Sequence, residues 1–159
     1  MTDHEIRNLL ERVQALEDRL AIYQLLATYG PAVDSVQAEV VSGMWASDGT
    51  YEPSGIAPFH GSEAVGQLVH QEPHQSYVSA GCAHVISLPH VTVDHDSAVA
   101  TGHSRVYLHT DAGWQVERVS ANRWELERGP DGWAVRRRLN HQLTGSEAGR
   151  ELLAEGLRR

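Results

Sequence analysis

The sequence predicts an α+β fold in which helices come first and a strongly curved antiparallel sheet follows. Two observations carry this prediction. Apolar residues recur at spacings of three and four through the first 27 residues, a pattern that is typical of an amphipathic helix. From Cys82 onward the pattern changes to period two, in long segments joined by short turns, which favours an antiparallel meander. Helices followed by such a meander are typical of α+β domains.

Length and composition indicate one globular domain. The chain has 159 residues, of which 41% are hydrophobic and 21% charged, which is enough for one buried core. No apolar run approaches the roughly 18 residues of a membrane span, so we expect no membrane association. The polar start lacks the basic and apolar regions of a signal peptide, so we expect a cytoplasmic protein. The single cysteine, Cys82, cannot form an intramolecular disulfide, as is usual in that compartment.

Charge excludes two classes of function. The net charge is −8, and all 13 basic residues are arginines. Without lysine there is no Schiff-base chemistry and no phosphate-loop lysine. An acidic chain repels nucleic-acid phosphates, and the one basic run, Arg136 to Arg138, alternates across a predicted strand instead of forming one patch. We therefore expect no nucleic-acid partner.

The N-terminal helices are expected over about residues 5–70. The first carries the apolar stripe. Its early part either forms an arm on a partner subunit or lies on its own domain, and we favour the second alternative. Pro31 removes a backbone hydrogen bond and should bend this helix near its end. A second helix is expected over Val36–Trp45 and a third from His60 to about His70. The stripe consists of Ile6, Leu9, Val13, Leu16, Leu20, Tyr23 and Ala27.

The sheet is expected over about residues 82–143, and it completes a single domain over residues 1–145. Its strands are predicted at 82–88, 91–95, 98–108, 114–127 and 132–143. Residues 146–159 form a C-terminal tail in which Ser146 and Glu147 favour the start of a helix. This tail is a flap over a pocket, a contact to another subunit or a frayed terminus.

The most informative stretch is the end of the first helix, where Tyr29, a Gly-Pro pair and Asp34 follow a strongly apolar face. Gly30 and Ala27 lie on the same side of the helix as Asp34 and leave room beside it. We expect Tyr29 and Asp34 to flank a pocket from adjacent sides. The alternative is that Asp34 caps the next turn and Tyr29 is an ordinary core residue.

Three polar side chains stand on predicted strands among apolar or mixed neighbours: His84, His103 and Asn122. If their faces are buried, these groups need hydrogen-bond partners, and Asp34 is the natural acceptor. We favour His84 as the partner of Asp34 and leave His103 open. Alternatively, each is a satisfied polar group of the core or its rim.

Other site chemistries have weaker support. The sequence holds no G-x-S-x-G motif, and Cys82 has no activating neighbour in the chain. A metal site is the strongest rival because there are ten histidines. His70 and His74 have helical ligand spacing, but Pro73 between them would break the helix that aims both rings. We therefore expect neither a metal nor a cofactor.

The order and spacing of several segments resemble the SnoaL-like branch of the nuclear-transport-factor-2-like superfamily, over about residues 14–143. Within that branch the layout is similar to bile-acid 7α-dehydratase, scytalone dehydratase and hexachlorocyclohexane dehydrochlorinase. The segments are Leu16 to Asp34, Trp45-Ala-Ser-Asp-Gly-Thr-Tyr51, His60-Gly61, His84, Ala100-Thr-Gly-His103, Asn122 to Arg128 and Asp131-Gly-Trp133.

The resemblance implies a conical α+β barrel, in which the curved sheet wraps a pocket closed by the N-terminal helices, and assembly as a homodimer or homotrimer. It implies an Asp34–His84 pair and a substrate contact from Tyr29. We assign substrate binding to further residues of the resembling segments: Trp45, Tyr51, His103, Asn122 and Trp124. The final-strand arginine of some bile-acid relatives has no clean match, because the corresponding region reads Leu139-Asn-His-Gln142.

Chemistry favours proton abstraction from carbon. A neutral imidazole is a useful base near neutral pH, and a carboxylate on its other nitrogen fixes the tautomer and stabilises the imidazolium. We therefore predict a dehydratase-like lyase or an isomerase that acts on a small hydrophobic substrate of polycyclic, polyketide-like or steroid-like type. Two alternatives remain: a non-catalytic small subunit of an aromatic-ring dioxygenase, and an inert ligand-binding module.

Overall fold

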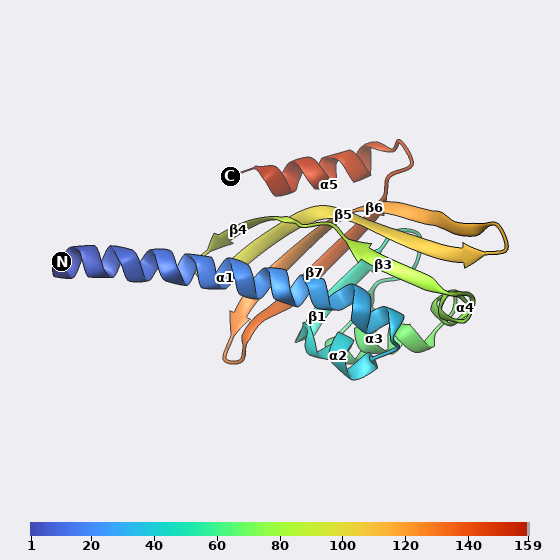
Figure 1. Ribbon diagram of the computed structural model, residues 1–159, viewed down its shortest axis with the longest axis horizontal. Coiled ribbons are helices and arrows are strands. Elements are labelled where there is room, and N and C mark those ends of the chain that lie inside the picture. The colour runs from blue at the N-terminus through green and yellow to red at the C-terminus, as the bar shows by residue number, and fades with distance from the viewer. Residues whose placement is uncertain (159) are drawn as a thin grey trace.

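The computed structural model describes residues 1–158, within which a curved seven-stranded sheet carries helices on both faces (Figure 1). The α+β prediction is confirmed, although the sheet is open rather than closed into a barrel. The elements in chain order are α1 (Asp3–Asp34), α2 (Ala38–Gly43), β1 (Trp45–Pro53), β2 (Phe59–His60), α3 (Ser62–Gln67), the 3-10 helix η1 (Leu68–His70), α4 (His74–Ala80), β3 (Cys82–Ile86), β4 (His90–Asp94), β5 (Ser97–Thr110), β6 (Gly113–Gly129), β7 (Gly132–Gln142) and α5 (Glu147–Leu157).

The strands lie in the order β2-β1-β7-β6-β5-β3, and β4 also pairs with β5. The long strands β5, β6 and β7 form the expected antiparallel meander. The sheet expected over residues 82–143 is antiparallel throughout, but β1, which lies before that range, adds a parallel pair with β7. Parallel pairs need a long crossover connection, and here everything from β2 to β6 separates the two strands. Alternation within one segment carries no information on such a distant pairing.

The helices depart from the expected ranges between residues 36 and 80. α2 is only six residues long, and Trp45 already begins β1 instead of ending a helix. The helix expected up to His70 is divided into α3 and η1. α4, which follows Pro73, was not expected at all. No helix within residues 1–158 is long and apolar enough to cross a membrane.

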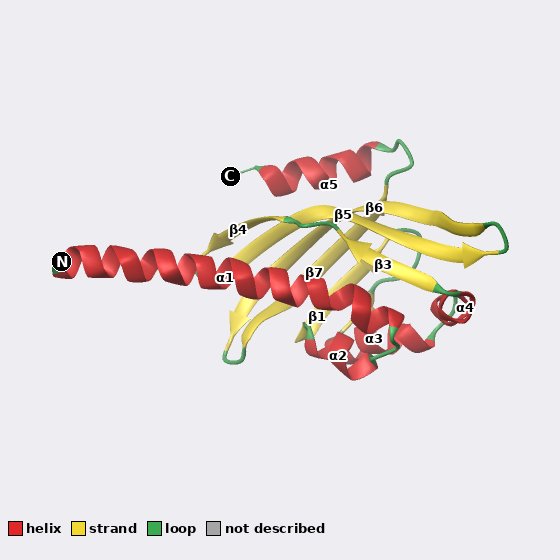
Figure 2. Ribbon diagram, viewed as in Figure 1, coloured by secondary structure: helices red, strands yellow, loops and turns green. Residues whose placement is uncertain are grey.

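The two halves of α1 differ in their surroundings. A capping box between Thr2 and Glu5 starts the helix, and its second half buries Ile22, Leu26 and Val33 against the sheet. The first half projects beyond the sheet (Figures 1 and 2). Its apolar residues are exposed, namely Ile6, Leu9, Leu10, Val13, Leu16 and Leu20. Our preference for a helix that lies wholly on its own domain is therefore wrong for the first half.

The inner face of the sheet, covered by α1, carries one polar row among apolar residues. Cross-strand pairing brings Tyr51, Arg138 and Trp124 side by side on β1, β7 and β6. The neighbouring pair in the sheet is Asn122 and Asn140. All five are at most 7% exposed, so the inner face holds a buried arginine and two buried amides.

The outer face of the sheet is covered by α5. Its Gly156 lies directly against Thr101 of β5, and Leu152 is buried. The tail is thus an ordered helix on the face opposite to α1 (Figure 2). Neither a frayed terminus nor a flap over an inner-face pocket describes this arrangement.

Candidate functional site

The site forms where the C-terminal end of α1 meets β3. Gly30 allows this approach, because a Cβ at that position would collide with the backbone carbonyl of His84. The small-residue face that the sequence showed near Asp34 is therefore the contact surface for a strand. With the backbones this close, Asp34 reaches the side chain and the backbone of β3 at once.

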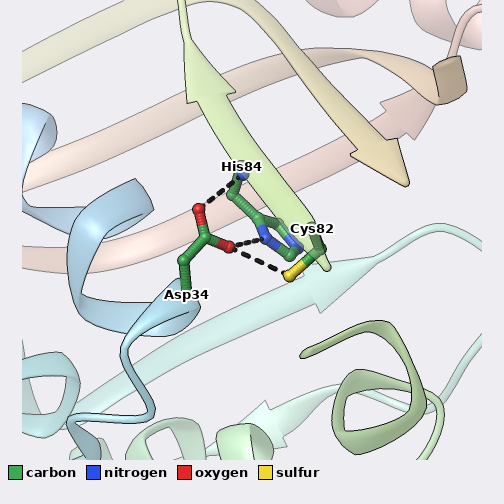
Figure 3. Close-up of side chains that lie close together, drawn as sticks. All are labelled: Asp34, Cys82 and His84. Carbon is green, nitrogen blue, oxygen red and sulfur yellow. Dashed lines mark hydrogen bonds and ion pairs between the residues drawn. The ribbon is translucent and has the colours of Figure 1, made fainter. Parts of the chain in front are cut away.

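Asp34 accepts three hydrogen bonds from β3 (Figure 3). Its Oδ1 lies 2.6 Å from His84 Nδ1, and its Oδ2 accepts the His84 backbone N–H at 2.8 Å. The Cys82 thiol donates to Oδ1 over 3.4 Å. The structure thus pairs Asp34 with His84 rather than with His103.

Electrostatics keep Asp34 ionised. Burial alone would raise the pKa of this carboxyl group, but the hydrogen bonds from His84 and Cys82 outweigh it and hold the pKa below its ordinary value. An ionised carboxylate can only accept, so His84 Nδ1 is the protonated nitrogen and Nε2 carries the free lone pair. The same environment raises the pKa of the Cys82 thiol to about 12, through burial and then the carboxylate. Cys82 is therefore a donor and not a nucleophile.

His84 lies in the wall of a cavity of about 360 Å³ between the sheet and α4. This volume is within the usual range for small-molecule pockets. Tyr29, Tyr51 and His74 share the wall with His84, and Arg118 and Asn140 also line it. The rest of the wall is mainly apolar and includes Pro53, Ile56, Phe59, Leu68, Pro73 and Tyr77.

A small inner chamber of about 10 Å³ shares the walls of this cavity at Tyr29, Tyr51 and His84. Arg138 and Ser104 complete its lining together with other residues of β5 to β7. A space of this size holds about one water molecule or one ligand oxygen. The dyad therefore stands at the junction of an apolar cavity and a polar chamber.

Arg138 is a site residue that sequence reasoning missed. It is 2% exposed, and its guanidinium carbon lies 4.2 Å from the ring centroids of Tyr29 and Trp124 and 4.5 Å from that of Tyr51. Asn122 Oδ1 accepts hydrogen bonds from its Nε and Nη2 at 3.1 and 2.9 Å. Arg138 thus sits in an aromatic cage, fixed by one buried amide.

The other predicted site residues differ in whether they line the cavity. Tyr29 and Tyr51 lie in the cavity wall as expected. Trp45, Trp124 and Asn122 are at most 4% exposed and pack behind Tyr29 and Arg138. None of these three lines the cavity or the chamber, and Asn122 holds the arginine in place.

His103 lies on the wrong side of the sheet for the site. Its pairing partner, Ala121, belongs to the outer face, and the His103 side chain is exposed. On β5 the inner face is formed by Ala98, Ala100, Ser104 and Val106, which alternate with the residues around His103. The expected contact of His103 with the pocket does not exist.

His74 is a second missed residue. Its Nε2 donates to the Val33 carbonyl at 2.8 Å, and its ring centroid lies 5.4 Å from that of His84. Burial, opposed by this hydrogen bond, holds the pKa of His74 below its ordinary value, so the ring is neutral beside the dyad. The helix break expected at Pro73 lies between the two histidines that have helical ligand spacing, and His70 is exposed while His74 is buried.

Ligand atoms of Asp34, Cys82 and His84 lie within 4.8 Å of one another, which raises the question of a metal. Each metal–ligand bond would be about 2 Å long. Two ligand atoms of a tetrahedral ion with such bonds stand roughly 3.3 Å apart, whereas His84 Nδ1 and Asp34 Oδ1 are 2.6 Å apart, which is a hydrogen-bond distance. The arrangement therefore fits a hydrogen-bonded acid–base pair.

The chain is similar to known proteins over most of its length. A profile of the SnoaL-like domain matches residues 14–139. A crystal structure of an NTF2-like protein with a cystatin-like fold from Novosphingobium aromaticivorans is 42% identical, with a TM-score of 0.90, and the match covers 92% of this chain and 96% of that one.

Two more distant structures share the fold. A protein of unknown function from Mycobacterium tuberculosis is 19% identical with a TM-score of 0.73, and the match covers 91% of this chain and 89% of that one. A protein from Catenulispora acidiphila, solved in complex with S-DNPA, is 22% identical with a TM-score of 0.68, covering 81% and 94%. No curated protein matches the chain.

Proposed function

Because the chain belongs to the SnoaL-like domain family, we propose that it is a dehydratase-like lyase or an isomerase that needs no cofactor. The hydrogen bond between Asp34 and His84 in the cavity wall carries this proposal. It leaves Nε2 of a neutral imidazole as a base at an apolar cavity of small-molecule size. The substrate class that suits the cavity is a small hydrophobic carbonyl compound of polycyclic, polyketide-like or steroid-like type.

In the proposed reaction His84 Nε2 removes a proton from a carbon next to a substrate carbonyl. The electron pair of that C–H bond forms the double bond of an enolate, and the negative charge moves to the carbonyl oxygen. Asp34 stabilises the imidazolium that results. General base catalysis of this kind contributes about 10²- to 10⁴-fold to the rate.

The two outcomes differ in where the proton on His84 goes next. In an isomerase the imidazolium returns its proton to a different carbon of the enolate. In a dehydratase the enolate expels a hydroxyl group from the β-carbon, and the imidazolium proton leaves with it as water. Both outcomes restore neutral His84, so the dyad supports either reaction without an external acid.

Tyr29 suits the role of hydrogen-bond donor to the developing charge. Burial raises the pKa of its hydroxyl group to about 12, although the nearby Arg138 opposes the shift. The phenol therefore keeps its proton throughout the neutral range. A fixed donor in a site that excludes water stabilises negative charge better than one in solution does. Tyr51, which also lines the cavity, suits the same role.

Hydrogen–deuterium exchange at carbon tests the proposal without knowledge of the natural substrate. A panel of cyclic ketones such as 2-tetralone is incubated with the protein in D₂O, and NMR follows the loss of the C–H signals next to the carbonyl. We expect exchange faster than in buffer, and its loss in His84→Ala and Asp34→Asn. Arg136→Gln, which removes an exposed arginine of β7, is the control and should exchange normally.

The same panel separates the alternatives. Exchange at the buffer rate throughout would favour the inert ligand-binding module or the non-catalytic dioxygenase subunit. Exchange that survives in His84→Ala would place the base elsewhere.

We further propose that the chain forms a homodimer or homotrimer. The apolar residues on the projecting half of α1 support this, because exposed apolar stripes of this kind commonly mark contact surfaces.

A further inference from the structure

We propose that the ligand of this cavity is an organic acid, and that its anionic oxygen enters the inner chamber beside Arg138. The inference deepens the proposed function, because it concerns the substrate of the same cavity. It rests on three observations: an unmatched buried charge, the size of the chamber and the charges around it. Its test measures binding alone, so it stands or falls separately from the acid–base chemistry.

The first observation is the unmatched charge of Arg138. Guanidinium does not lose its proton in proteins, so this 2% exposed side chain is a permanent buried cation. Within residues 1–158, no carboxylate forms an ion pair with it. Its hydrogen-bond acceptor, Asn122 Oδ1, is neutral and also receives the Asn140 amide at 2.9 Å. A buried charge is normally paired with an opposite charge, whereas here the protein supplies one neutral amide oxygen and three aromatic rings.

The second observation is a donor without an acceptor. Nε and Nη2 of Arg138 bind Asn122, while the buried Nη1 has no partner among the described residues. Arg138 lines the inner chamber, whose volume of about 10 Å³ admits a single oxygen atom. One oxygen of a carboxylate would supply the missing acceptor and the missing negative charge together. The ring system of the ligand would remain in the larger apolar cavity.

The third observation is a second arginine at the junction. Arg118 lines both the chamber and the cavity, and it forms no ion pair within residues 1–158. Asp34, the acid of the site, is already engaged by His84. Of the nearby glutamates, Glu72 is exposed and bonded to Ser76, and Glu117 is exposed and accepts the Tyr77 hydroxyl. Arg118 and Arg138 therefore line the same chamber, whereas the two glutamates are exposed and bonded to other side chains.

These observations favour an acid over a neutral carbonyl compound. A neutral oxygen would accept the Nη1 hydrogen bond but leave both arginines without countercharge. A carboxylate forms charge-assisted hydrogen bonds, which are about twice as strong as neutral ones. Arginine is also well suited to hold a carboxylate in a fixed orientation. The dyad would then act on a carbon at a set distance from this anchor.

A matched pair of probes tests the inference: 2-naphthoate and 2-naphthamide, which have the same shape and differ in charge. Calorimetric titration at pH 7 compares them on the whole protein and on Arg138→Met, Arg118→Gln and Arg136→Gln. We expect naphthoate to bind about 10- to 100-fold more tightly than naphthamide to the wild-type protein. The preference should disappear in Arg138→Met and weaken in Arg118→Gln. Arg136→Gln removes the same charge at an exposed position of β7 and should leave the preference intact.

Equal binding of the two probes to the wild-type protein would overturn the inference, as would a naphthoate preference that persists in both pocket variants. Should Arg138→Met fail to fold, the wild-type comparison and Arg118→Gln still decide. The wild-type protein separates this inference from the proposed function, because the naphthoate preference and the exchange at carbon are measured independently. A protein that prefers naphthoate but catalyses no exchange would be an acid-binding module.

Discussion

Replacing Asp34 by asparagine should reverse the tautomer of His84. The His84 backbone N–H is always a donor, so it requires an oxygen where Oδ2 stands now, 2.8 Å away. The asparagine oxygen must take that position, which places its NH₂ group against His84 Nδ1. Two donors cannot face each other, so Nδ1 must become the acceptor and the proton must move to Nε2.

The expected cost is the loss of the general base. With its proton on Nε2, His84 presents a donor to the cavity instead of a lone pair. Because general base catalysis contributes about 10²- to 10⁴-fold, turnover should fall by that factor, equivalent to about 3–5 kcal/mol in the barrier. The fold should survive, since asparagine has nearly the same shape as aspartate and keeps the backbone contact.

Long-range ¹H–¹⁵N NMR of histidine-labelled protein at pH 8 tests the reversal directly and needs no substrate. It reports which ring nitrogen carries the proton, and the spectrum of His84→Gln identifies the His84 signals by their absence. We expect Nδ1–H in the wild-type protein and Nε2–H in Asp34→Asn. If His84 keeps its proton on Nδ1 in the variant, the assignment of Asp34 as the group that fixes the tautomer is refuted.

Three further predictions concern stability and assembly. Hydrogen bonds with Arg128 lower the pKa of Asp18 from 3.8 to about 2, so the ionised carboxylate stabilises the folded state above pH 4 and loses that effect as pH falls toward 2. In urea titrations at pH 7, Asp18→Asn should be about 1–2 kcal/mol less stable than wild type. The difference should shrink as the pH falls from 4 to 2. Burial depresses the pKa of His74 in the folded state, so as pH drops below about 6.5 the unfolded chain binds a proton at this residue before the folded protein does. The free energy of unfolding of wild type should therefore fall below about pH 6.5, and that of His74→Gln should fall less. Leu16→Glu combined with Leu20→Glu changes two exposed residues of α1, and light scattering should show that it converts an oligomer into monomers. A wild-type monomer would contradict this.

Much of the fold and the dyad followed from local sequence patterns. The apolar stripe of α1 and the alternation after Cys82 were sufficient for the fold class, and the resemblance to SnoaL-like proteins is confirmed by the profile match. Local patterns offered Asp34 as an acceptor for either His84 or His103, and the resemblance to SnoaL-like proteins implied the pair with His84. The roles of these residues in catalysis stay predictions.

Arg138 escaped prediction because the alternation breaks within β7. A β-bulge opposite Glu125 and Leu126 shifts the register, so that Val135 and Arg138, three residues apart, are both buried on the inner face. Strict period-two reasoning assigns these two residues to opposite faces. The run of three arginines therefore served only as an argument against one basic patch, whereas its last member is a buried cation.

His103 was misplaced for a related reason. Both sets of alternating residues on β5 contain apolar members, and the tail that covers the outer face was of undecided role. Once α5 packs on Thr101, apolar residues are needed on both faces of the sheet. Alternation alone therefore could not say which histidine faces the pocket.

The contact between Gly30 and β3 makes the geometry of the site depend on the absence of a Cβ atom at residue 30. The separation of base and acid is set by two backbones in van der Waals contact, and not by the reach of flexible side chains. A single methyl group at position 30 would push α1 away from the strand and stretch the 2.6 Å bond without altering any polar atom. The chemistry proposed for this site would then be lost through packing alone, at a residue that has no side chain of its own.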